Sequence, residues 1–207
     1  MKLLMENWRH FLNEGMKMPG DLPDGLQVRI GDFGDDMISF EIVDEETGKS
    51  PTKEKRLEKF GTVDGFMYIG KYKDKAGNKC LDAFEVRFVE AKGGFGPMLY
   101  DLAIEYATQN GGGLIADRYN VSDEAYSVWH KYNNMRDDVE SIQLDNLENE
   151  LTPDAEDNCI QKSSVRWSKI REIPWEDTAT ARIYRKNNLE MTNRLRKIGK
   201  LHDETSI

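Results

Sequence analysis

The sequence has few of the residues from which metal sites and disulfide frameworks are built. It contains two cysteines, Cys80 and Cys159, and three histidines, which are His10, His130 and His202. The cysteines lie far apart and form no metal-ligand spacing, and the histidines fall in three separate segments where surface positions are expected. We therefore predict no metal site and no disulfide framework, and a reducing compartment is the simplest inference.

The sequence also lacks a long apolar run and an excess of positive charge. No stretch approaches the length of a membrane span, and the N-terminus has no signal-peptide pattern. The 207 residues carry a formal net charge of -9, whereas a general nucleic-acid binder needs a clustered positive surface. We expect a cytoplasmic protein that binds neither membrane nor nucleic acid. Its length suits one domain, or one domain with an appendage.

A glycine-rich joint between a strand and a helix is the most informative stretch that the chain does contain. Residues 81–107 read LDAFEVRFVEAKGGFGPMLYDLAIEYA. Phe84, Val86 and Phe88 alternate with charged residues, which predicts a strand over residues 82–90 with those three side chains on one face.

The helix that follows this strand has a predicted apolar face and an acidic outer face. Apolar residues recur from position 99 at i, i+3, i+4, i+7 and i+8, and this spacing leaves Asp101 and Glu105 outside. Three glycines in positions 93–96 permit positive φ, and Pro97 suits the first turn of a helix. The free N-H groups of the turn and the helix dipole favour a phosphate, by about 0.3–1 kcal/mol from the dipole alone. The alternative is a turn without a ligand.

The elements around this joint form a regular order. Alternating patterns predict strands at 27–30, 37–43 and 66–72, which form an antiparallel meander that leads into residues 82–90. A short apolar strand at 114–116 follows the helix. Because a helix separates the two strands, we expect them to be parallel neighbours with a ligand-prone crevice at their carboxyl ends.

The flanking segments carry weaker patterns. Residues 3–14 are amphipathic and predict a docked terminal helix, or alternatively a helix that binds a partner. Residues 137–158 are acidic and predict a solvated, mobile loop, or alternatively a binding role such as nucleic-acid mimicry. Residues 164–170 and 180–184 are candidate strands. Residues 189–201 predict a basic amphipathic helix that is docked or faces a partner.

The order of elements resembles the GNAT superfamily of N-acetyltransferases. The signature of that family, R/Q-x-x-G-x-G/A, opens a helix, and Gly94-Phe95-Gly96 fits its G-x-G part. The resemblance covers residues 27–135. It implies an α+β domain with a mixed, mostly antiparallel sheet flanked by helices, followed here by a C-terminal extension. It also implies an acetyl-CoA-dependent enzyme that transfers an acetyl group directly to an amine of a small molecule or a protein.

The resemblance implies the residues that would hold acetyl-CoA. In the family, backbone N-H groups of the turn bind the pyrophosphate, and the preceding strand is splayed so that pantetheine bonds to its main chain. The pyrophosphate role falls on Gly93, Gly94, Phe95 and Gly96. The pantetheine role falls on Arg87, Phe88 and Val89. Glu85 on the same strand is the candidate general base, acting directly or through a water molecule.

The chain departs from the family pattern at three positions. Ala91 stands at the basic or amide position of the signature, and Pro97 withdraws one backbone donor. The second-helix pattern N-x-x-A-x-x-L-Y aligns with residues that begin at Ser122 and places Trp129 where many members have a tyrosine that protonates the departing thiolate. Indole is no acid at neutral pH. Tyr126 and Tyr132 lie nearby, out of register, and are the remaining general-acid candidates.

These departures leave two other functions open. One is a catalytically degenerate acetyltransferase fold that serves as a binding or assembly module, with a protein partner held by the terminal helices. The stretches MKLLMENWRHFLNE and VSDEAYSVWHKY look like acetyltransferase-like proteins of large tailed phages, which would place the protein in an infected bacterial cell or a virion. The other is an acidic decoy or inhibitor that acts through residues 137–158.

Overall fold

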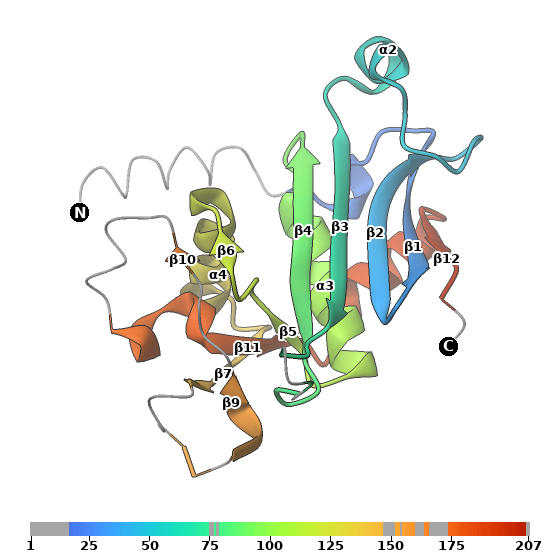
Figure 1. Ribbon diagram of the computed structural model, residues 1–207. Helices are drawn as coiled ribbons and strands as arrows, with labels where there is room; N and C mark the ends of the chain where they lie inside the picture. The colour runs from blue at the N-terminus through green and yellow to red at the C-terminus, as the bar shows by residue number, and fades with distance from the viewer. Residues whose placement is uncertain are drawn as a thin grey trace, which may run out of the picture.

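The computed structural model of the protein is built on one curled sheet. It describes residues 17–74, 77, 79–146, 152–153, 155–159, 164–165 and 174–205. Eight strands pair in the order β12-β1-β2-β3-β4-β5-β11-β7, and all neighbours are antiparallel except β12 with β1 and β4 with β5 (Figure 1). The protein is therefore an α+β protein with a mostly antiparallel sheet, as the sequence predicts. The helix predicted at 3–14 lies outside the described residues.

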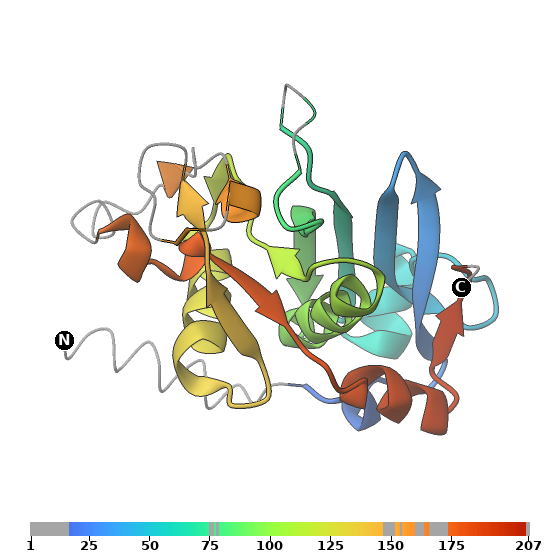
Figure 2. The ribbon, with the colours of Figure 1, turned by 90° about the horizontal axis from the view of Figure 1, so that it is seen from below.

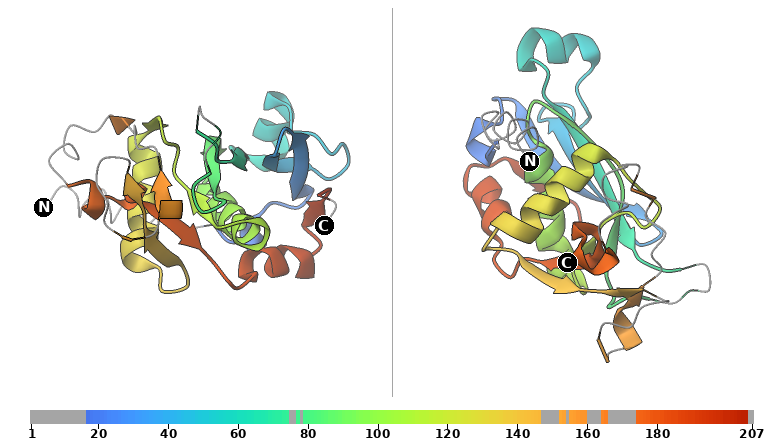
Figure 3. Two further views of the ribbon diagram at one scale, coloured as in Figure 1. Left: turned by 60° about the horizontal axis from the view of Figure 1, so that its bottom comes forward. Right: turned by 90° about the vertical axis from the view of Figure 1, so that its left-hand side faces the viewer.

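The first half of the sheet is the predicted antiparallel meander. Its strands are β1 (Leu26–Gly34), β2 (Met37–Asp44), β3 (Asp64–Lys71) and β4 (Phe84–Lys92). The turn between β1 and β2 consists of Asp35 and Asp36, whose φ angles of 51° and 61° suit a tight hairpin, so this predicted hairpin is confirmed. Between β2 and β3, α2 (Lys53–Lys55) and a π-helical turn (Arg56–Phe60) extend from one end of the fold (Figure 3).

Two helices follow the meander. Helix α3 (Gly96–Asn110) crosses one face of the sheet and contacts β2, β3, β4, β5 and β11 (Figure 2). Strand β5 (Leu114–Ile115) then pairs in parallel with β4, which confirms the predicted arrangement. Helix α4 (Asp123–Met135) begins at Ser122, whose hydroxyl accepts a hydrogen bond from the backbone N-H of Ala125 at 3.2 Å.

The C-terminal part completes both edges of the sheet. Strand β7 (Glu140–Gln143) pairs with β11 (Arg182–Arg185), and β12 (Leu201–Asp203) follows α5 (Glu190–Lys197) and pairs with β1. The prediction of a mobile loop over residues 137–158 is therefore wrong for its first part, because β7 belongs to the sheet. The shorter pairs are β6 (Asn120–Val121) with β10 (Ser164–Val165), and β8 (Asp145–Asn146) with β9 (Asn158–Cys159).

Short 3-10 turns connect several of these elements. They are Pro19–Asp21, Ala155–Asp157, Trp175–Asp177 and Ala179–Ala181. No helix in the described ranges has both the length and the apolar character that a membrane crossing requires.

Strand β4 contains a bulge that the alternating pattern does not predict. Its pairing with β3 passes from Phe88 to Val86, so Arg87 is an extra residue. An extra residue moves every later side chain to the opposite face. Phe88 is consequently 48% exposed, while Val89 packs against the core. The expectation that Phe88 shares a face with Phe84 and Val86 is therefore wrong.

Helix α3 is buried on more sides than an amphipathic surface helix. Asp101 and Glu105, which the helical spacing places outside, are both buried. The reason is that the segment joining β11 to α5 packs over them and brings the cation Lys186 between the two carboxylates. A helical period cannot reveal this burial, because the covering segment is more than eighty residues away in the sequence.

The two cysteines are paired. Cys80 and Cys159 form a disulfide across a sequence separation of 79, with Cα atoms 5.4 Å apart, a usual spacing for such a bond. A backbone hydrogen bond of 3.0 Å from Leu81 to Glu156 holds the same two segments together. The prediction of no disulfide is therefore wrong, because the partners meet only through the fold. The pairing also removes the argument for a reducing compartment.

Candidate functional site

A cleft opens where the parallel strands β4 and β5 separate. The strands pair at two positions, Phe84 with Leu114 and Glu85 with Ile115. Beyond these pairs lies a cleft of about 260 Å³. Residues 86–89 of β4 form one wall, and residues of the segment after β5, from Asp117 to Ser122, form the other. Tyr100, Ala125 and Trp129 contribute the helical side.

The glycine turn connects β4 to the start of α3. Gly93 and Gly94 have φ angles of 74° and 83°, a region that L side chains rarely adopt. A Cβ atom added at Gly93 would lie 3.2 Å from a methyl group of Val63, so the turn packs tightly against the sheet. The buried Phe95 ring anchors the turn. The turn is hydrogen-bonded and passes directly into α3, whose first residue is Gly96.

Glu85, the candidate base, is buried rather than exposed. Its side chain is 1% exposed, and one carboxylate oxygen accepts a hydrogen bond of 2.7 Å from the backbone N-H of Arg118. The other oxygen forms an ion pair of 2.7 Å with Arg87. Burial raises the pKa of Glu85 above its usual value, against the opposing effects of these two partners. Arg87 lines the cleft, whereas Glu85 is not among the residues that line it.

The candidate general acids on α4, Tyr126 and Tyr132, interact with groups that do not line the cleft. The hydroxyl of Tyr132 donates a hydrogen bond of 2.6 Å to Asp101, and burial, together with that carboxylate, raises the pKa of Tyr132 well above its usual value. Tyr126 is buried and interacts with the backbone of Ala179. In the described part of the chain, neither tyrosine lines the cleft, whereas Trp129 does.

Tyr100 on α3 is a cleft residue that the sequence reasoning missed. Its side chain is 2% exposed, and its hydroxyl has no hydrogen-bond partner among the described residues. Its ring packs edge-on against Trp129 with 5.2 Å between ring centroids. Burial raises the pKa of the hydroxyl, and the charge of Asp117 raises it further. No local signal marks this residue, because a tyrosine beside an apolar helical stripe is usually part of the core.

An exposed row of aromatic rings reaches the mouth of the cleft. Phe88, which lines the cleft, stacks on Phe66 with 5.0 Å between centroids and an interplanar angle of 9°. Phe66 contacts Tyr68 at 5.6 Å, and Tyr68 contacts Phe33 at 5.1 Å. The bulge at Arg87 brings Phe88 into this row, so the face of the sheet opposite α3 carries an aromatic surface that ends at the cleft.

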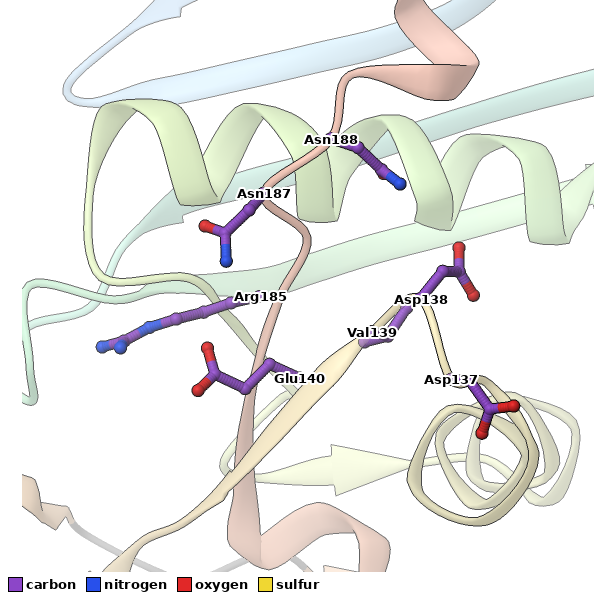
Figure 4. Close-up of a pocket in the computed structure, with 7 residues that line it drawn as sticks. All are labelled: Asp137, Asp138, Val139, Glu140, Arg185, Asn187 and Asn188. Carbon is purple, nitrogen blue, oxygen red and sulfur yellow. The ribbon is translucent and has the colours of Figure 1, made fainter.

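A second hollow lies between the start of β7 and the segment from β11 to α5 (Figure 4). Its volume is about 420 Å³, and charged and amide side chains line it. In Figure 4 the carboxylates of Asp137 and Asp138 point away from the side chains of Glu140 and Arg185. Three carboxylates, one guanidinium and two amides are among the groups that line the hollow.

A network of charges lies beside this hollow. The ammonium group of Lys186 is within 3.2 Å of Glu105, 3.3 Å of Asp138 and 3.5 Å of Asp101. Arg136 bonds Asp138 at 2.6 Å and Asp101 at 3.1 Å. Burial alone would lower the pKa of Lys186, but the three carboxylates raise it. The network joins α3, the end of α4 and β11.

Asp138 is expected to make the stability of the protein depend on pH in the acid range. Hydrogen bonds and charge from Arg136 lower the pKa of Asp138 to about 2, compared with about 3.9 for an unfolded aspartate. The ionised carboxylate therefore stabilises the fold above about pH 4, and this contribution disappears as the pH falls toward 2. In chemical denaturation, Asp138→Asn should be less stable than wild type at neutral pH, with the difference shrinking toward pH 2.

The neighbouring substitution Asp137→Asn serves as the control for Asp138→Asn. The Asp137 carboxylate is exposed and in Figure 4 points away from that of Asp138, so Asp137→Asn should change the stability of the protein little at every pH. If the difference in the free energy of unfolding between Asp138→Asn and wild type were constant from pH 7 to pH 2, the lowered pKa of Asp138 would be contradicted.

The fold and the cleft define an α+β protein with a ligand-sized opening between two diverging parallel strands. Within the described residues, no group of three or more histidine, cysteine, aspartate or glutamate side chains is placed to hold a metal ion. No protein-family model matches the chain, and neither a curated protein nor a solved structure matches it.

Proposed function

We propose that the protein is an acetyl-CoA-dependent N-acetyltransferase of GNAT type that transfers an acetyl group directly to an amine. The observation that carries the proposal is the divergence of β4 and β5 into a cleft that Tyr100, near the start of α3, also lines. A parallel pair that separates leaves one edge of β4 over residues 86–89 without a strand partner among the described residues. An extended amide ligand such as pantetheine can pair with such an edge.

The residues present fit the two ends of acetyl-CoA. The N-H groups of Gly94, Phe95 and Gly96 and the positive end of the α3 dipole suit a diphosphate. The cleft between β4 and the segment after β5 suits pantetheine. When bound, acetyl-CoA would supply a thioester, whose acetyl group is transferred to the nitrogen of the amine. Holding the amine and the thioester together supplies several kcal/mol of the barrier reduction.

Glu85 is the proposed proton acceptor, through a water molecule. A carboxyl whose pKa is raised by burial is a better base than an exposed one. Because Glu85 is paired with Arg87 and does not line the cleft, a water molecule is the proposed link between its carboxylate and the amine. The exposed ring of Phe88 at the mouth of the cleft offers a surface for the acceptor.

A binding module without transfer activity is the second candidate. It is favoured by the ion pair that occupies Glu85 and by the alanine at position 91, which packs against the core where the family has a basic or amide side chain. The enzyme requires acetyl-CoA to bind and to be turned over, whereas the module holds a protein partner and requires neither.

Isothermal titration calorimetry with acetyl-CoA tests the proposal. We expect one saturable site, and adenosine 3′,5′-bisphosphate should compete for it because the turn binds the phosphate end. Absence of saturable binding at millimolar acetyl-CoA would refute both the cofactor and the transfer reaction, and would leave the module as the remaining candidate. If acetyl-CoA binds, release of free thiol in the presence of a panel of amines distinguishes the two, because the module releases none.

A further inference from the structure

Phe88 is the residue at which the cleft meets the aromatic row of the sheet. It lines the cleft, and its side chain is 48% exposed. Without the bulge at Arg87, position 88 would share the buried face of Phe84 and Val86. Bulges are frequent beside functional sites, where they redirect a side chain. Here the bulge turns a large apolar ring out of the core and places it at the mouth of the cleft.

Phe66 and Phe88 form a ring stack that holds the Phe88 ring in one orientation. The two rings are 5.0 Å apart between centroids and 9° from parallel. Strands β3 and β5 flank β4 on opposite sides (Figure 1). Phe66 lies on β3 and so covers the side of the Phe88 ring that is turned toward that strand. The other side of the ring is turned toward the region where β4 and β5 separate and the cleft lies.

The charged side chains next to the ring stack are paired with other charges. Glu41 on β2 and Glu90 on β4 lie directly opposite Phe66 in the sheet. Glu41 forms an ion pair of 2.8 Å with Arg29. Glu90 forms an ion pair of 3.3 Å with Lys92. Because these charges already have counter-charges, the ring stack suits an uncharged planar group better than a charged one.

We propose that the amine accepted by the protein carries an aromatic ring, which stacks on the outer side of the Phe88 ring. This inference rests on the proposed function and names its class of acceptor, primary amines that bear an aromatic group. Phe88 determines specificity by contact with the part of the acceptor that does not react. Phe66 is a positioning residue that acts through Phe88. A saturated ring of similar size lacks the flat π face that stacking requires.

The test compares matched pairs of amines, one with a phenyl and one with a cyclohexyl group on the same carbon chain. A pocket that selects only for apolar surface has no reason to prefer phenyl over cyclohexyl. Thiol release from acetyl-CoA gives kcat/KM for each amine, and ligand-detected NMR titration gives its Kd without turnover. We expect the phenyl amines to be favoured by about three- to tenfold in both measurements.

Variants of the row assign this preference to one ring. Phe88→Leu keeps an apolar side chain without a ring, so the preference should fall to about one, mainly through KM, whereas Phe88→Tyr should retain it. Phe66→Leu should lower the preference partly, because Phe88 loses its support. Phe33→Leu is the matched control, since Phe33 is 61% exposed in the same row and is not among the residues that line the cleft. Thermal unfolding establishes that each variant folds.

The outcomes separate the two proposals. If no amine releases thiol from acetyl-CoA, the proposed function fails, and the inference fails with it. If amines are acetylated but the phenyl compounds have no advantage over their cyclohexyl counterparts, the inference is overturned while the proposed function stands. The same conclusion follows if Phe88→Leu keeps the full advantage, or if Phe33→Leu loses as much of it as Phe88→Leu does.

Discussion

Gly94→Asp is expected to abolish acetyl-CoA binding, lowering the affinity by more than about a hundredfold. The substitution places a carboxylate at the turn whose N-H groups and helix dipole are proposed to hold the diphosphate. Like charges in contact cost several kcal/mol, and each 1.4 kcal/mol is a factor of ten in affinity. Calorimetric titration of the variant with acetyl-CoA measures the effect.

The control for Gly94→Asp is Gly94→Asn. Gly94 has a φ of 83°, so any side chain there strains the backbone, but asparagine and aspartate tolerate this region comparatively well. The two side chains have the same shape and differ in charge. Gly94→Asn should therefore retain most of the affinity that Gly94→Asp loses. Equal affinities in both variants and the wild-type protein would show that the diphosphate binds elsewhere.

The parts of the fold that the sequence predicts carry local signals. The meander, α3 and the start of α4 follow from alternation, helical period and an N-cap serine, all of which act within a few residues. Strands β7 and β12 lack such a signal, since neither contains a fully buried side chain. Their positions are set by pairing with β11 and β1, which are distant in the sequence.

The candidate site also combines features that the sequence predicts with features that depend on distant contacts. The glycine turn and the parallel pair that opens into a cleft are readable from the sequence, because glycine spacing and element order are local. The burial of Glu85 depends on the backbone of Arg118 folding over it, and the bulge at Arg87 depends on the register with β3. Tyr100 lines the cleft only because α4 places Trp129 against its ring, and among the described residues its hydroxyl has no hydrogen-bond partner.

Helix α3 carries buried charged side chains that its sequence pattern does not indicate. Asp101 and Glu105 occupy positions that a helical period assigns to solvent, yet the fold covers both. Glu105 also accepts hydrogen bonds from the backbone N-H groups of Met191 and Thr192, at 2.8 and 2.9 Å, and so holds the start of α5. The carboxylate of Glu105 thus connects α3 to α5, which leads to β12 at the edge of the sheet.

Lys186→Met is expected to lower the free energy of unfolding by about 3–5 kcal/mol. The lysine side chain is 1% exposed and lies between Glu105, Asp138 and Asp101. Methionine fills a similar volume but leaves buried carboxylates without their cation, and an uncompensated buried charge is costly. Equilibrium denaturation in urea at neutral pH measures the loss.

Two further variants show whether the loss comes from the charge. Lys197→Met makes the same change at an exposed position of α5 and should alter stability by no more than about 0.5 kcal/mol. Adding Glu105→Gln to Lys186→Met removes one stranded carboxylate while the amide oxygen can still accept hydrogen bonds from α5. The double variant should therefore be more stable than the sum of the two single losses predicts. Strictly additive losses would mean that Lys186 stabilises the protein through packing, because two groups that interact through charge cannot be lost independently.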